Sequence, residues 1–166
     1  MDAALLLLRI VVGLYVLGHG LQKLFGWLGG PGLVGFAQAT ERMRFRPPRL
    51  WAVVAGISES AGLLFALGLL TPLAVAGIAS AMLTATFSVH LGKGWFSGKG
   101  GPELPLTNLA VAVAVLLVGP GRWSLDAALG LSYPSPQTQL AVAILVVAGV
   151  AFLFATRRAA PPPPAG

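Results

Sequence analysis

Five long apolar runs are the feature of this sequence that most constrains its fold. They cover about residues 4–26, 50–70, 73–91, 105–119 and 140–156. About 20 apolar residues in an α-helix cross a bilayer core of about 30 Å, and in lipid the backbone must satisfy its own hydrogen bonds. Only 10% of the residues are charged, against about 25% in ordinary soluble domains. The runs predict an all-α integral membrane protein, with the boundaries of the fourth and fifth runs the least sharply marked.

The distribution of basic residues predicts how these runs cross the membrane. If all five cross, only Arg9 and Arg122 fall towards one side. Cytoplasmic loops carry an excess of Lys and Arg, so the N-terminus is expected outside and the C-terminus in the cytoplasm. If the fifth run does not cross, the C-terminal arginines change side. This rule also accounts for the formal charge of +6, and no nucleic-acid partner is expected. The opposite side would carry Lys23, Arg42, Arg44, Arg46, Arg49, Lys93, Lys99, Arg157 and Arg158.

The segments outside the runs are expected to lie at the membrane surface. Residues 29–48 read as a loop that is first rich in glycine and then in arginine; "ERMRFRPPR" fits a plain cytoplasmic loop better than a basic amphipathic stretch on anionic headgroups. The tail "AAPPPPAG" cannot continue a helix and predicts a disordered end. Tryptophan is favoured at membrane interfaces, and all four tryptophans fall at predicted span ends: Trp27, Trp51, Trp95 and Trp123.

Polar side chains within the apolar runs are the second unusual feature. His19 and Lys23 are four residues apart, on one face of the first run, and Glu59 lies well inside the second. A charged residue near the centre of a span costs about 2.5–3.5 kcal/mol on insertion scales, so it normally faces a partner or a cavity. Because consecutive spans are antiparallel, these groups share one half of the bundle. They predict a ligand or proton site formed by His19, Gln22, Lys23, Glu59, His90 and Asn108.

Within this group Glu59 is expected either to pair with Lys23 or to hydrogen-bond to His19. Each residue alone also has a simpler explanation, since Lys23 can extend to headgroups and His90 can be interfacial. Arg9 is expected to reach the headgroups on the opposite side. Gly56 and Ser60, four residues apart, predict close helix packing.

Several kinds of chemistry remain possible for these side chains. A quinone or proton site suits donors such as His19 and Lys23 beside a proton-exchanging Glu59, and a purely structural network uses the same groups. A metal site is disfavoured because the sequence has no HxxxH or ExxH pair and no cysteine. The stretch "GKGWFSGKGG" lacks the order of a phosphate-binding loop.

Four ordered blocks carry a resemblance to a known family. They are "LRIVVGLYVLGHGLQKLFGW", "ISESAGLLFALGLLTPLA", "HLGKGWF" followed by "GGPELPLTNLA", and "LLVGPGRWSLDAALG". Together they resemble the DoxX family of small bacterial membrane proteins over about residues 5–130. Positions that match the family pattern are Arg9, His19, Gly20, Gln22, Lys23, Gly26, Glu59, Gly62, Gly68, Glu103, Gly121, Ser124 and Asp126.

The resemblance implies a transmembrane four-helix bundle in the inner cell membrane and an association with redox systems, since the family name comes from a subunit of a thiosulfate:quinone oxidoreductase. Three segments are expected: a DoxX-like bundle over residues 1–130, a linker with an additional fifth transmembrane helix over 131–156, and a disordered Pro-rich tail over 157–166. The block "GPGRWSLD" reads as structural closure of the bundle, with Ser124 capping a short helix.

The leading functional hypothesis is a subunit of a membrane oxidoreductase system that contacts quinone, with lipid and redox-complex proteins as partners and homo-oligomerisation left open. The alternatives are a small transporter or ion-conducting protein, and a non-catalytic assembly protein. No cofactor motif or nucleophile arrangement is visible, so the isolated chain is expected to be non-catalytic or to act only as an oxidoreductase subunit.

Overall fold

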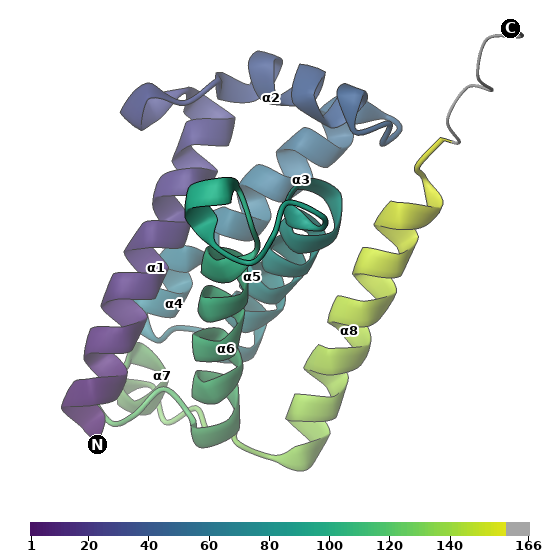
Figure 1. Cartoon of the computed structure of the whole chain (residues 1–166). Helices are drawn as coiled ribbons and strands as arrows, with labels where there is room; N and C mark the ends of the chain where they lie inside the picture. Colours follow the sequence, from purple (N-terminus) through teal and green to yellow (C-terminus); the bar gives the residue numbers. More distant parts are fainter. Residues whose placement is uncertain (159–166) are drawn as a thin grey trace, which may run out of the picture.

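The computed structural model describes residues 1–158, and these residues form a helical bundle (Figure 1). The predicted tail beyond Arg158 lies outside the described residues. Four helical segments of 20 to 24 residues are long and apolar enough to cross a membrane, and the fifth is a shorter apolar helix. All five predicted runs are therefore helical, which confirms the all-α membrane fold. The segments are α1 (Asp2–Phe25), α3 with α4 (Pro48–Ser60 and Gly62–Leu67), α5 with the π-helical turn η2 (Thr71–Ala85 and Thr86–His90), α6 (Glu103–Val118) and α8 (Pro136–Ala155).

Short helices close the two ends of the bundle. α2 (Gly32–Arg42) lies across the end at which α1 finishes (Figure 1), where the sequence predicted only a loop. It forms because it packs on both α1 and α3 and buries Thr40. Tertiary packing of this kind stabilises helices too short to persist alone. The remaining short elements are η1 (Trp27–Gly29), η3 (Ser97–Lys99) and, at the opposite end, α7 (Leu125–Ala128).

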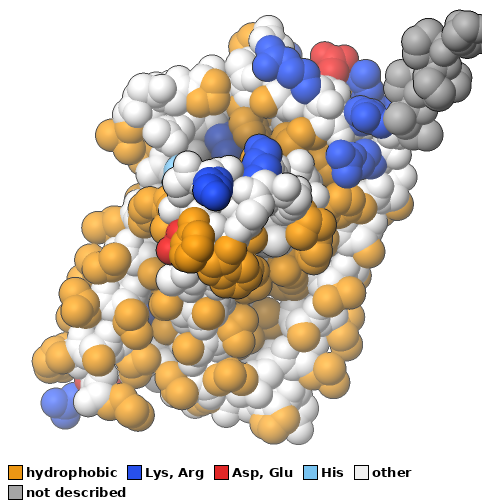
Figure 2. Space-filling model, in the orientation of Figure 1, with side chains coloured by type: hydrophobic (Ala, Val, Ile, Leu, Met, Phe, Trp, Pro, Cys, Tyr) orange, Lys and Arg blue, Asp and Glu red, His pale blue; other side chains and the backbone are white. Residues whose placement is uncertain are grey.

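The fifth apolar run, α8, is an outer helix that packs mainly on α5. Only 11% of the residues in its most apolar stretch are buried. The buried residues of α8 are Val142 and Val146. At its end the backbone of Arg157 forms an antiparallel bridge with Phe45, in the loop between α2 and α3. α8 therefore finishes at the same end of the bundle as the arginine-rich loop. Figure 2 shows Lys and Arg gathered at this end, above a lateral surface that is mainly hydrophobic.

Glycines let α1 approach α3 and α4 closely. A Cβ atom on Gly20 would lie 2.7 Å from the backbone nitrogen of Ser60 and 2.9 Å from the carbonyl oxygen of Gly56. Further along α1, a Cβ atom on Gly13 would lie 2.6 Å from the carbonyl oxygen of Gly62. Small residues are the usual means of close helix approach in lipid. The predicted packing role of Gly56 and Ser60 is confirmed, with α1 as their partner.

Two neighbouring glycines of α1 provide a test of this packing. Gly20→Ala is expected to lower the free energy of unfolding by about 1–3 kcal/mol, because the added methyl group meets backbone atoms that cannot move aside. Gly18→Ala is the control, since its Cβ would meet only Leu28 Cδ1 at 3.5 Å; it should be neutral or should stabilise by up to about 1 kcal/mol through higher helix propensity. Unfolding in mixed micelles measures both, and equal effects would contradict the close approach.

Candidate ligand and proton site

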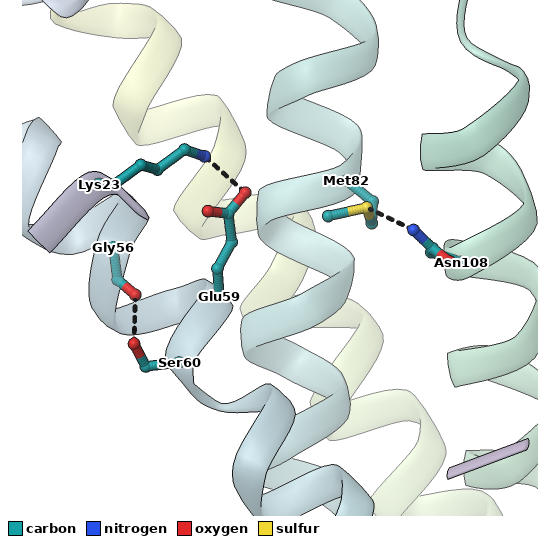
Figure 3. Close-up of polar contacts among 6 residues, drawn as sticks. All are labelled: Lys23, Gly56, Glu59, Ser60, Met82 and Asn108. Carbon is teal, nitrogen blue, oxygen red and sulfur yellow. Dashed lines mark hydrogen bonds and ion pairs between the residues drawn. The ribbon is translucent and has the colours of Figure 1, made fainter. Parts of the chain in front are cut away.

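An ion pair between α1 and α3 lies at the centre of the candidate site. Lys23 Nζ is 2.5 Å from Glu59 Oε1. Figure 3 shows the two side chains extending toward one another from their separate helices. The side chain of Glu59 is only 5% exposed, whereas that of Lys23 is 21% exposed. Of the two partners predicted for Glu59, Lys23 is therefore the one that contacts it.

Local structure fixes both members of this pair. Lys23 lies in the last turn of α1, which ends at Phe25 because Gly26 adopts a left-handed conformation (φ +73°) that favours glycine. α2 then crosses above, and the ring of Phe36 lies 4.7 Å from Lys23 Nζ. On α3, Glu59 Oε2 is buried without a hydrogen-bond partner among the described residues. The pair thus has an aromatic ring beside its lysine and, on its glutamate, an oxygen that can still accept a hydrogen bond.

The other predicted residues of α1 point to different partners. The His19 ring packs edge-on against Tyr15, with ring centroids 4.9 Å apart. In the described part of the chain no hydrogen bond joins His19 to Glu59, so that predicted alternative is not formed. Gln22 Nε2 donates to the carbonyl oxygen of Leu28 at 3.2 Å, which ties α1 to the turn that follows it.

His90 is the last residue of η2, which continues α5, and Asn108 belongs to the neighbouring helix α6. His90 Nδ1 lies 2.6 Å from the carbonyl oxygen of Gly100, inside the loop that joins the two helices. Asn108 Nδ2 donates weakly to Met82 Sδ at 3.9 Å, as Figure 3 shows. All six predicted residues lie towards the basic end of the bundle, but the direct contact among them is the one between Lys23 and Glu59.

The structure also limits what the site can hold. Among residues 1–158, no three His, Asp or Glu side chains are close enough to bind a metal ion. A lipid-facing hollow of about 620 Å³ lies at the opposite end of the bundle, between α1, α4 and the segment containing Trp123. Lys23 and Glu59 do not line it. The pair itself presents ammonium N–H donors on Lys23 and a carboxylate acceptor on Glu59.

A second buried polar cluster, which the sequence reasoning did not predict, lies at that opposite end. Arg9 is fully buried and its Nη2 donates to the carbonyl oxygen of Trp123 at 2.5 Å. The expectation that Arg9 reaches the headgroups is wrong, because the chain after α6 folds back across α1 and covers it. Arg9 Nε and Nη1 have no hydrogen-bond partner among the described residues.

Asp126 is the fully buried acidic member of this cluster. Its carboxylate accepts hydrogen bonds from the backbone nitrogens of Leu70 (2.8 Å) and Thr71 (3.0 Å) and from Thr71 Oγ1 (2.6 Å). It therefore caps the N-terminus of α5, where negative charge is favoured. Ser124 Oγ accepts from the backbone nitrogen of Ala127 at 3.2 Å, as predicted for the cap of α7. Leu70, the residue that precedes α5, has no side chain that can cap the helix. This lack was the one signal in the sequence that a residue from a distant segment caps α5.

The sequence was compared with models of known protein families, with curated proteins and with solved structures. Residues 4–91, slightly more than half of the chain, match the family model described as DoxX. The matched region runs from α1 to the end of η2 and contains both Lys23 and Glu59. Comparisons with curated proteins and with solved structures gave no match.

Proposed function

The chain belongs to the DoxX family of membrane proteins, and from this premise we propose that it is a membrane subunit of a redox system that binds a quinone headgroup beside Lys23 and Glu59. The family resemblance suggests the redox association. The single observation that carries the choice of site is the buried Lys23–Glu59 pair, in which Glu59 Oε2 has no partner among the described residues. Buried polar groups without partners are uncommon and mark candidate ligand positions.

The residues present fit a quinone headgroup chemically. A quinone carbonyl oxygen accepts hydrogen bonds, and the ammonium group of Lys23 has N–H groups besides the one directed at Glu59. The hydroxyl of the reduced quinol can donate a hydrogen bond to Glu59 Oε2, and the carboxylate can take up the hydroxyl proton. The ring of Phe36 adds an apolar aromatic surface next to Lys23. The pair would supply hydrogen bonds and would take up the proton that the quinol releases, while the electrons would pass to a partner oxidoreductase.

The quinone proposal is tested by binding. Equilibrium dialysis of a short-chain quinol against the detergent-purified protein is expected to show saturable binding. Glu59→Gln should weaken this binding by about tenfold, because the hydrogen bond from the quinol hydroxyl to a charged carboxylate is replaced by one to a neutral amide. Glu103→Gln is the matched control. It neutralises a carboxylate at the same end of the bundle, whose Oε2 accepts from the backbone nitrogen of Ser97 at 2.9 Å, and it should leave binding unchanged. Absence of saturable binding, or equal losses in the two variants, would overturn the proposal.

A structural role is the second candidate. Lys23 and Glu59 contact each other directly, next to the close approach of Gly20 to Gly56. A pair in this position can fix the register of α1 on α3 within an assembly protein. In that case Glu59→Gln would lower the unfolding free energy, quinone binding would be absent, and co-purification would recover a catalytic partner with the native chain.

A further inference from the structure

We propose that the basic end of the bundle contains a binding site for the phosphate of an anionic lipid headgroup, formed by Arg44, Arg49, Arg157 and Arg158. These four residues, here called the arginine patch, come from the α2–α3 loop, the first turn of α3 and the segment that follows α8. All four are exposed. The site is separate from the Lys23–Glu59 pair and does not depend on the function proposed for that pair.

Backbone contacts bring the two parts of the arginine patch together. Phe45 and Arg157 form an antiparallel bridge, and the backbone nitrogen of Arg158 donates to the carbonyl oxygen of Arg44 at 3.0 Å. Arg157 Nε donates to the carbonyl oxygen of Met43 at 3.0 Å. Arginines that are more than 100 residues apart in the sequence are thus held side by side. A loop that served only as a positively charged cytoplasmic segment would not need these backbone contacts with the segment after α8.

Aromatic packing beneath the arginine patch fixes its position. Phe45 is 1% exposed and packs edge-on against Phe154, with ring centroids 5.4 Å apart. Trp51 packs against Phe152 at 5.9 Å, and its indole nitrogen donates to the carbonyl oxygen of Arg46 at 3.0 Å. Indole rings favour the membrane interface, so Trp51 places the patch at headgroup depth. This depth is the reason for assigning a lipid rather than a phosphate free in solution.

The charge of the patch is not neutralised within the described part of the chain. The nearby Glu41 is paired with Arg46 at 2.6 Å, and no ion pair in residues 1–158 involves the four arginines of the patch. Figure 2 shows Lys and Arg side chains gathered at this end of the molecule. Guanidinium groups bind phosphate oxygens in a bidentate manner. Clustered arginines beside a span therefore fit an anionic lipid better than a zwitterionic one.

The experiment titrates the detergent-purified full chain with mixed micelles that contain either phosphatidylglycerol or phosphatidylcholine, and follows binding by thermophoresis. The native chain should bind phosphatidylglycerol more tightly. The double variant Arg44→Gln/Arg158→Gln should weaken this binding by about tenfold or more, given the usual contribution of each basic residue near an anionic surface. Arg157 is left intact because its side chain also holds the loop.

The control variant Lys93→Gln/Lys99→Gln removes the same charge from the exposed α5–α6 loop at the same end. It should change binding less than about twofold, because these two lysines are not part of the arginine patch. Arg44→Lys/Arg158→Lys keeps the charge but removes the bidentate guanidinium groups, so it should lose less affinity than the glutamine variant. A helical circular dichroism spectrum like that of the native chain excludes loss of folding as the cause. Equal losses in the two glutamine variants would overturn the proposal, as would equal affinity for the two lipids. Competition by millimolar inorganic phosphate would show a free anion as the ligand and would also overturn it.

Discussion

Lys23→Met is expected to lower the free energy of unfolding by about 3 kcal/mol. The substitution removes the counter-ion of Glu59 and leaves its carboxylate buried, and removal of one partner of a buried pair typically costs about 3–5 kcal/mol. We expect the lower part of this range because the Lys23 side chain is 21% exposed, so water already reaches part of the pair. The loss is measured by unfolding in mixed micelles, with helical circular dichroism as the signal.

Two further variants identify the source of this loss. Lys99→Met removes an exposed lysine at the same end and should change stability by less than about 0.5 kcal/mol. Lys23→Met/Glu59→Gln removes both charges and should recover much of the loss, because a neutral pair carries no unpaired buried ion. If Lys23→Met were no more destabilising than Lys99→Met, or if the double variant were worse than the sum of the two single variants, Lys23 and Glu59 would not act as a stabilising pair.

The pairing of Lys23 with Glu59 could be predicted because it follows from two simple rules. Apolar runs of sufficient length define the spans, and consecutive spans are antiparallel, so the end of the first meets the start of the second. Depth along each helix then places both Lys23 and His19 within reach of Glu59, so the pairing with Lys23 is predicted as one of two alternatives. The same rules do not say which helices are adjacent to one another around the bundle axis. For this reason His90 and Asn108 were grouped with the pair, although they make their own contacts at the α5–α6 side.

The features that escaped prediction depend on how loops fold back onto helices. α2 is an amphipathic helix, but it is short and its glycines favour a loop, so its helical state depends on packing against α1 and α3. Arg9 is buried by Trp123, which lies 114 positions further along the chain. No periodicity in the first run indicates this contact. Both cases involve residues whose partners come from distant segments, and span length and charge counts contain no information about such pairings.

Gly68→Ala is expected to be the most damaging of the conservative substitutions, with a loss of about 3–5 kcal/mol on unfolding, the range of changes that disrupt a buried polar network. Gly68 has φ +62°, and a Cβ atom there would occupy the position of Arg9 Nη1 and lie 2.6 Å from Ser124 Cβ. Its carbonyl oxygen also accepts from the backbone nitrogen of Asp126 at 2.8 Å. The added methyl group would therefore displace Arg9 and disturb the closure of the bundle.

Gly130→Ala is the matched control, because Gly130 has a similar φ of +69° but no atom within 4 Å of its Cβ position. Its free energy of unfolding should fall only by the conformational cost of an alanine in the left-handed region, about 1–2 kcal/mol. The difference between the two losses then measures the displacement of Arg9 and its neighbours, without the backbone strain common to both. Equal losses in the same unfolding assay would mean that Arg9 can leave its buried position at little cost, and that the second polar cluster does not hold the bundle closed.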